Sequence, residues 1–140
     1  MRVAIADAHV LFRDGLAMAL DQVLEQEIKL VECTDLEQLQ RCLKISECDL
    51  IIVASNSLPD HSKSTFDTLR KIGKHNPIIV SVDHLHELPH FRKSNLDGVI
   101  SKTAPMSSHI KLMKLLIEQG KSENLLNPFL KKACRQLTKN

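Results

Sequence analysis

Short apolar runs and amphipathic helical patterns alternate along residues 2 to 119 of this sequence. Five runs rich in valine and isoleucine have the length and composition of strands that are covered on both faces. These runs are Arg2 to Ala6, Ile28 to Cys33, Leu50 to Ala54, Pro77 to Val82 and Gly98 to Ser101. Elsewhere, apolar side chains recur every three or four residues, as they do on one face of a helix. The clearest such patterns are Phe12 to Leu24, Leu36 to Leu43, Phe66 to Ile72 and Met106 to Gln119.

The alternation of the two patterns predicts a parallel sheet. Parallel neighbours cannot be joined by a tight turn, so each connection needs a crossover, and right-handed crossovers place helices on both faces. We therefore expect a doubly wound, three-layer α/β domain with a five-stranded parallel sheet. The segment from Leu85 to Ser94 is the least clear helix, because Pro89 would interrupt it unless this residue lies in the first turn.

Composition narrows the class of protein. A chain of 140 residues with 43% apolar content can bury one core, and it is too short for two sizeable ones. The net charge of +2 comes from basic and acidic residues that are spread along the chain. This distribution gives no indication of a surface that binds nucleic acid. The amino terminus lacks the zones of a signal peptide and no apolar run approaches a membrane span, so we expect a cytoplasmic protein without membrane contact. The four cysteines form no C-x-x-C pair, and we expect free thiols.

Residues that follow the predicted strands are the candidates for a functional site. In an open sheet of this kind, ligands bind outside the carboxyl ends of the strands, where the strand order reverses. The residues at these ends are Asp7, Ala8, Ala54, Val82 and Lys102. The polar turn after the third run contains no carboxylate from Leu50 to Pro59.

Three stretches carry a resemblance to a known family: Met1 to His9, Asp49 to Asp60, and Asp97 to Lys102. Together they resemble the CheY-like receiver domain of two-component response regulators, and Ile5 to Leu16 resembles the LuxR/NarL class in particular. The resemblance spans about residues 1 to 120. It implies a flavodoxin-like sheet with the strand order 2-1-3-4-5.

The resemblance also implies roles for the residues at the strand ends. In receivers, paired acids after the first strand hold Mg²⁺, an aspartate after the third strand accepts phosphate, a serine or threonine ends the fourth, and a lysine ends the fifth. Asp7 matches the first acid and Lys102 matches the lysine, whereas Ala8, Ala54 and Val82 replace the other three groups. The phosphorylation site is thus degenerate. Because Mg²⁺ prefers several hard oxygen ligands in octahedral geometry, we expect its binding to be lost, with no other cofactor in its place.

The charges that remain at this site suggest two further expectations. An ionised Asp7 would be costly to bury alone, and Lys102 is its expected ion-pair partner. Asp83 could bring a second carboxylate to Lys102 and so imitate a permanently phosphorylated receiver; the alternative is that it caps a turn or is solvated. Asp60, six residues beyond Ala54, is an alternative phosphate acceptor, and we do not expect it to act as one.

The predicted helix Met106 to Gln119 has apolar residues around much of its circumference. This breadth exceeds what one core contact needs. We therefore expect a homodimer through this helix, with or without the first helix; the alternative is a well-buried terminal helix. The expected interface residues are Ile110, Met113, Leu116 and Ile117. Val99 replaces the switch aromatic that the resemblance implies, so we expect control by something other than phosphate.

Two further clusters of polar residues invite a chemical interpretation. Three histidines follow the fourth predicted strand: His84, His86 and His90. The last two have helical metal-ligand spacing, but Pro89 disturbs the geometry between them, and we expect a polar loop rather than a metal site. The second cluster comprises Ser55, Ser57, Asp60 and His61. No G-x-S-x-G elbow frames either serine, so we expect no enzyme.

The carboxyl-terminal residues indicate what the domain is connected to. Asn127 and Pro128 are typical of an N-cap and a first helical position, and they predict a helix from Pro128 to Gln136. The closing Leu137 to Asn140 resembles the opening of the helix-turn-helix domain in the LuxR/NarL class. We therefore expect a receiver-like domain over residues 1–121 and a linker helix over 122–140. DNA would be contacted only through a helix-turn-helix domain that is missing from this chain.

Taken together, these features indicate an atypical receiver of a response regulator or transcriptional regulator, which works by phosphorylation-independent dimerisation and protein interaction. A partner regulator or a kinase is a further candidate partner. Two alternatives remain open. The first is a small-molecule sensor that uses the vacated acidic pocket, and the second is a stand-alone antagonist of a partner regulator or kinase.

Overall fold

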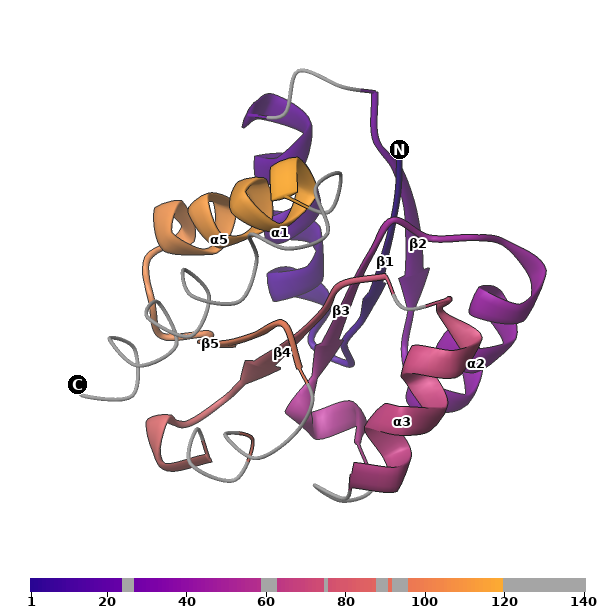
Figure 1. Ribbon diagram of the computed structural model, residues 1–140. Coiled ribbons are helices and arrows are strands. Elements are labelled where there is room, and N and C mark those ends of the chain that lie inside the picture. The colour runs from indigo at the N-terminus through magenta and orange to yellow at the C-terminus, as the bar shows by residue number, and fades with distance from the viewer. Residues whose placement is uncertain (24–26, 59–62, 75, 88–90, 92–95, 120–140) are drawn as a thin grey trace.

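The computed structural model describes residues 1–23, 27–58, 63–74, 76–87, 91 and 96–119. Its five strands form one parallel sheet in the order β2-β1-β3-β4-β5, which confirms the predicted fold class (Figure 1). The strands are β1 (Arg2–Ala6), β2 (Lys29–Cys33), β3 (Leu50–Ala54), β4 (Ile78–Val82) and β5 (Gly98–Ser101). The helices are α1 (Val10–Val23), α2 (Leu36–Ile45), α3 (Lys63–Ile72) and α5 (Met106–Gln119). Single 3₁₀ turns follow β3 at Ser55–Ser57 and β4 at Leu85–Glu87.

The strands differ in burial according to their place in the sheet. Every residue of the inner strands β3 and β4 is buried, as expected for strands that are covered on both faces. The edge strand β2 instead exposes Lys29 and Glu32 and buries only Cys33. Polar side chains on β2 therefore mark an edge, where one side of the backbone has no neighbouring strand.

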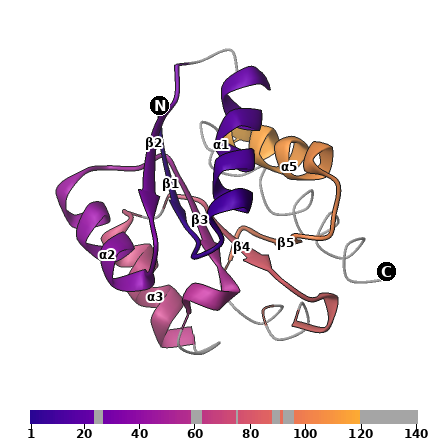
Figure 2. The same ribbon diagram turned by 180° about the vertical axis from the view of Figure 1, so that it is seen from behind.

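The helices form the two outer layers of the domain. Figures 1 and 2 show α1 and α5 on one face of the sheet, and α2 and α3 on the other. Alternate strand residues point to opposite faces, so each layer has its own apolar core. Beneath α1 and α5 the core includes Val3, Ile5, Leu16, Leu20, Ile52 and Ile100. Beneath α2 and α3 it includes Ala4, Leu39, Val53, Phe66, Leu69 and Val80. Within the described part of the chain, no helix combines the length and apolar character needed to cross a membrane.

The apolar breadth of α5 is used within the chain itself. Ile110, Met113 and Leu116 are buried in the core beneath α1 and α5, and Ile117 packs against the same core while partly exposed. The first three side chains are therefore not available to a second chain, and their expected place in a dimer interface is wrong for this packing. The helix is broad in its apolar surface because it contacts both the sheet and α1. The helix α5 is therefore well buried within the chain, which was the alternative to a dimer helix.

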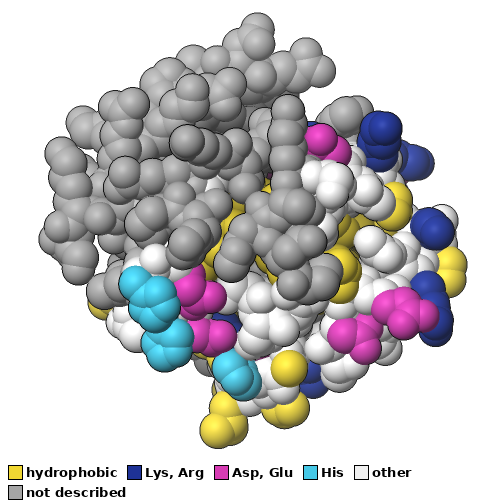
Figure 3. Space-filling view, turned by 90° about the horizontal axis from the view of Figure 1, so that it is seen from below, with side chains coloured by type: hydrophobic (Ala, Val, Ile, Leu, Met, Phe, Trp, Pro, Cys, Tyr) yellow, Lys and Arg dark blue, Asp and Glu magenta, His cyan; other side chains and the backbone are white. Residues whose placement is uncertain are grey.

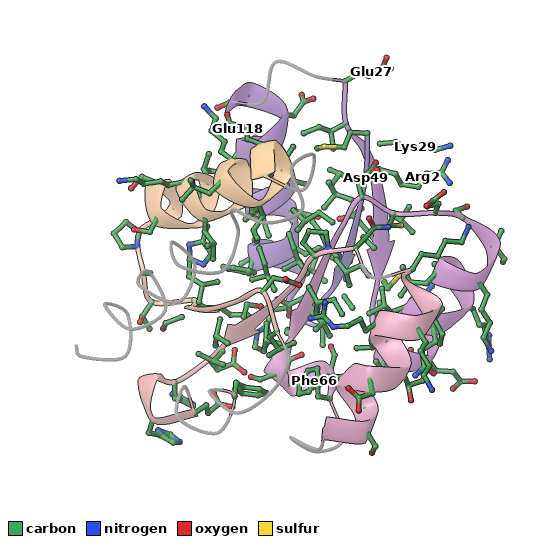
Figure 4. All side chains as sticks on the ribbon, in the orientation of Figure 1. Arg2, Glu27, Lys29, Asp49, Phe66 and Glu118 are labelled. Atoms are coloured by element: carbon green, nitrogen blue, oxygen red, sulfur yellow. The ribbon has the colours of Figure 1, made fainter. Side chains whose placement is uncertain are left out.

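The parallel sheet brings the carboxyl ends of all five strands to one edge. At the opposite edge the backbone N–H of Arg2 donates to Asp49 Oδ2 at 2.9 Å, and Figure 4 shows these two residues beside Lys29, far from Phe66. The strand order reverses at β1, because the chain passes from β1 to β2 on one side and then to β3 on the other. The carboxyl ends of β1 and β3 therefore flank the position where doubly wound domains bind ligands.

A pair of leucines on α1 tests this core. Leu16 is fully buried, so Leu16→Ala should lower the free energy of unfolding by about 2–5 kcal/mol through lost burial and a residual cavity. Leu11 is 89% exposed on the same helix, and Leu11→Ala should change it by less than about 0.5 kcal/mol. Urea unfolding followed by circular dichroism measures both. Equal effects of the two substitutions would contradict the packing of α1 described here.

Candidate functional site

Asp7 is the buried carboxylate at the centre of the edge where the strands end. It directly follows β1, and its side chain is 2% exposed. The backbone N–H of His9 donates to Asp7 Oδ1 at 2.8 Å, and the Asp7 N–H donates to the Cys33 carbonyl at 3.0 Å. Arg13 Nη1 donates to the Asp7 carbonyl at 2.8 Å. The backbone around Asp7 is thus held by α1 on one side and β2 on the other.

Lys102, which follows β5, is the cation that faces Asp7. Its Nζ lies 2.8 Å from Asp7 Oδ2 and 3.0 Å from Oδ1, with hydrogen-bond geometry at Oδ1. The Lys102 side chain is only 10% exposed. The ion pair expected from the sequence is therefore present and largely withdrawn from water, where each charge strongly depends on the other.

Asp83 provides a second carboxylate for the same ammonium. Its Oδ1 lies 3.2 Å from Lys102 Nζ, and its side chain is partly exposed. The backbone N–H of Lys102 donates to the Val82 carbonyl at 2.9 Å, which keeps the residues after β4 and β5 side by side. Lys102 consequently lies between two acids that come from different strand ends.

His9 and Asn56 complete this network, and the sequence did not single them out. His9 Nδ1 lies 2.9 Å from Lys102 Nζ and 3.5 Å from Asp83 Oδ1. Asn56 Nδ2 lies 3.3 Å from both Asp7 Oδ1 and His9 Nδ1. Lys102 and the Asn56 amide are donors, so His9 Nδ1 lies where it can accept from both of them. The only signal in the sequence was that both residues follow predicted strands within two or three positions.

The remaining predicted site residues are apolar. Ala54 and Val82 are fully buried at the ends of β3 and β4, and Ala8 is exposed. None of the three side chains can accept a phosphoryl group or coordinate a metal ion. The polar groups beside Ala54 are hydroxyls: Ser55 and Ser81 are buried, and their Oγ atoms have no hydrogen-bond partner.

The residues at this edge are a poor fit for Mg²⁺, the ion that the resemblance implies. Mg²⁺ needs several oxygen ligands around one centre. The carboxylates of Asp7 and Asp83 both contact the Lys102 ammonium, so they already share a cation that the chain itself provides. Among the described residues, no group of three or more histidine, cysteine or acidic side chains has an arrangement that could hold a metal ion.

Aromatic side chains support the network from the α1 and α5 side. Lys102 Nζ lies 5.0 Å from the centre of the Phe12 ring, which is a cation–π distance. The Phe12 ring in turn meets His109 of α5 edge-on, with ring centroids 5.5 Å apart. Burial lowers the pKa of His109, while its hydrogen bond to the Pro105 carbonyl acts in the opposite direction. A neutral His109 is thus part of the apolar packing that connects α5 to the site.

The two other polar clusters are only partly described. The rings of His84 and His86 stack 5.3 Å apart, and the His84 N–H donates to Glu87 Oε2 at 2.9 Å. His90, Asp60 and His61 lie outside the described residues, so the proposed metal spacing and the alternative acceptor are not described. In Figure 3, histidine and acidic side chains lie next to one another on the face seen from below.

The sequence matches no protein-family model, and no curated protein matches it. Several solved structures have a similar fold. A LuxR family DNA-binding response regulator from Silicibacter pomeroyi is 18% identical with a TM-score of 0.71, covering 84% of this chain and 92% of that chain.

Two further structures extend this comparison. A response regulator from Burkholderia pseudomallei, with a phosphorylated aspartic acid, a calcium ion and citrate, is 18% identical with a TM-score of 0.65, covering 91% of this chain and 75% of that chain. The RcsB response regulator of Salmonella typhimurium is 19% identical with a TM-score of 0.74, covering 99% of this chain and 66% of that chain. At such identities the likeness shows the fold: this chain folds as the receiver domains of response regulators do.

The buried ion pair can be tested by removing its cation. Lys102→Met keeps the apolar stem but leaves the Asp7 carboxylate buried without compensation, which should lower the free energy of unfolding by about 3 kcal/mol. The same substitution at Lys74, whose ion pair with Glu47 spans 3.9 Å between exposed side chains, should change it by less than about 1 kcal/mol. Urea unfolding near neutral pH measures both variants.

A double variant separates loss of the pair from loss of packing. Asp7→Asn with Lys102→Met removes both charges, so it should recover most of the stability that Lys102→Met alone loses. If Lys102→Met were no more destabilising than Lys74→Met, the pair would not be what stabilises this edge.

Proposed function

We propose that this chain is a receiver-like domain that does not undergo phosphoryl transfer and that acts in signal transduction through protein contacts. It would serve a response regulator or transcriptional regulator in the cytoplasm, without enzymatic activity and without Mg²⁺. The observation that carries the proposal is the closed network of Asp7, Lys102, Asp83 and His9, beside a β3 strand that ends in Ala54.

The chemistry of phosphoryl transfer supports this proposal. Transfer to a protein carboxylate needs an acceptor and a cation that neutralises the phosphoryl oxygens. The Burkholderia structure contains a phosphorylated aspartic acid and a calcium ion. In the present chain the methyl group of Ala54 ends β3, and the two nearby carboxylates Asp7 and Asp83 already share the Lys102 ammonium. A metal ion would have to displace the Lys102 ammonium from both acids.

Asp83 gives the proposal a further element. Its carboxylate supplies a fixed negative charge 3.2 Å from Lys102 Nζ, without any modification of the protein. We infer that this charge imitates a permanently phosphorylated receiver and maintains the domain in one conformation. Val99, buried in the core where the family resemblance implies a switch aromatic, is consistent with a domain that does not change state.

Homodimerisation remains part of the proposal, but through a different surface. Since Ile110, Met113 and Leu116 are buried, a dimer on the α1 and α5 side would use side chains that the fold leaves exposed. Leu11 and Met18 of α1 are exposed apolar residues of this kind. The two residues are seven positions apart, so they lie on the same face of α1.

Contact with DNA is proposed only through another domain. The RcsB structure concerns interaction with DNA, and this chain spans about two thirds of that protein. The predicted linker helix over 122–140 lies outside the described residues. A partner regulator or kinase remains a candidate partner, whereas the structure offers no observation that favours a small-molecule sensor.

Phosphorylation gives the direct test. The purified chain is incubated with acetyl phosphate and Mg²⁺, and its intact mass is measured. Because no carboxylate replaces Ala54 at the end of β3, we expect no gain of a phosphoryl group. A receiver with an acceptor aspartate, treated in the same tube, serves as the positive control. A labile gain of one phosphoryl group on this chain alone would refute the proposal, and peptide mapping would show whether Asp60 carries it.

A second experiment concerns Asp83. Asp83→Asn keeps the shape of the side chain but removes its charge beside Lys102, so we expect a shift of the sedimentation profile towards the monomer. Glu47→Gln, which removes a charge from the exposed pair with Lys74, should leave the profile unchanged. Identical profiles for Asp83→Asn and the unmodified chain would eliminate the phosphate-mimic role while leaving the loss of phosphoryl transfer intact.

A further inference from the structure

Two thiols from different elements meet on the α2 side of the sheet. Cys33 is the last residue of β2, Cys42 lies in α2, and their Sγ atoms are 3.7 Å apart. A disulfide bond has a sulfur–sulfur distance near 2.05 Å, so the two atoms would have to approach by about 1.7 Å. Side-chain rotation in α2 is the movement that would close such a gap.

The two thiols differ in their access to solvent. Cys42 is partly exposed, whereas Cys33 and the neighbouring Cys48 are buried. Burial, followed by the contact with Cys42, raises the pKa of Cys33 to about 12, so this residue stays a thiol near neutral pH. Burial also raises the pKa of Cys48. An oxidant from solution would therefore meet Cys42 first.

We propose that Cys33 and Cys42 are an oxidation site, at which a hydroperoxide converts the two thiols into a reversible disulfide. In the first step, written for hydrogen peroxide, the Cys42 sulfur attacks one peroxide oxygen and the O–O bond breaks. The departing hydroxide takes the Cys42 thiol proton and leaves as water, and Cys42 becomes a sulfenic acid. In the second step the Cys33 sulfur displaces the hydroxyl group from Cys42 Sγ, and the Cys33 proton leaves with it as a second water. Two thiols lose two electrons in total, and one peroxide gains them.

The position of Cys33 and Cys42 places the oxidation next to Asp7 and its ion pair with Lys102. Cys33 uses its carbonyl to accept the hydrogen bond from the Asp7 N–H at 3.0 Å, so it lies directly beside the end of β1. A bond from Cys33 to Cys42 would tie the edge strand β2 to α2 covalently at this point. Reversible disulfides of this kind, rather than permanent ones, are found in reducing compartments.

The neighbouring thiols define the competing outcomes. Cys48 lies close enough to affect the titration of Cys33, so it could compete for oxidised Cys42. Within the described residues, no arrangement of histidine, cysteine and acidic groups suits a metal ion, which favours oxidation over metal binding for these thiols. Cys134 lies outside the described residues and is removed from the experiment by substitution.

The full chain carrying Cys134→Ser is treated with hydrogen peroxide, remaining thiols are blocked with iodoacetamide, and the protein is digested with trypsin without reduction. Cleavage after Lys29, Arg41, Lys44 and Lys63 puts Cys33, Cys42 and Cys48 on three separate peptides. We expect a crosslinked species of peptides 30–41 and 42–44 that disappears on treatment with dithiothreitol.

Matched variants make the assignment specific. Cys48→Ser should keep the crosslink and Cys42→Ser should abolish it, with circular dichroism showing that each variant is folded. The proposal is overturned if 42–44 is instead joined to 45–63, if the crosslink connects two chains, or if Cys42 is oxidised without any crosslink. Phosphorylation competence is measured separately, so a failure here does not bear on the proposed function.

Discussion

The two ion pairs of the Lys102 ammonium are the interactions on which the carboxyl-terminal end of the sheet depends. The ammonium lies between the carboxylates of Asp7 and Asp83, and it is the cation that pairs with the nearly inaccessible Asp7 side chain. Asp7 in turn accepts from the His9 N–H and is held at its carbonyl by Arg13, so the turn from β1 into α1 is arranged around the same charge. The ends of β1, β4 and β5 are thereby tied together by one cation.

This arrangement explains how the receiver fold is stabilised at this end of the sheet with Ala54 as the last residue of β3. A carboxylate cluster at the carboxyl edge of such a sheet repels itself and requires a cation to neutralise it. Here the chain carries fewer acids at the edge and supplies the neutralising cation itself, with His9 and Asn56 occupying further hydrogen-bonding positions. Lys102, His9 and Asn56 therefore stabilise this end of the sheet with the protein's own groups.

Much of the architecture could be predicted from local patterns. The strand limits agree with the apolar runs to within one residue, and α5 spans Met106–Gln119 as its periodicity indicated. The Asp7–Lys102 pair could also be predicted, because both residues directly follow strands whose ends meet. The interface assigned to Ile110, Met113 and Leu116 was wrong because periodicity shows that a helix face is apolar, but not whether the sheet or another chain covers it.

The sequence by itself determined the layered fold and the absence of a carboxylate from Leu50 to Pro59, since both follow from residue types and their spacing along the chain. Only the tertiary structure decided which side chains meet. Lys102 and His9 are 93 residues apart, Asn56 and His9 are 47 apart, and Cys33 contacts Cys42 from a different element. The physical reason is that hydrogen bonds and ion pairs act over a few ångströms, and only the assembled parallel sheet brings strand ends from distant parts of the chain within that range.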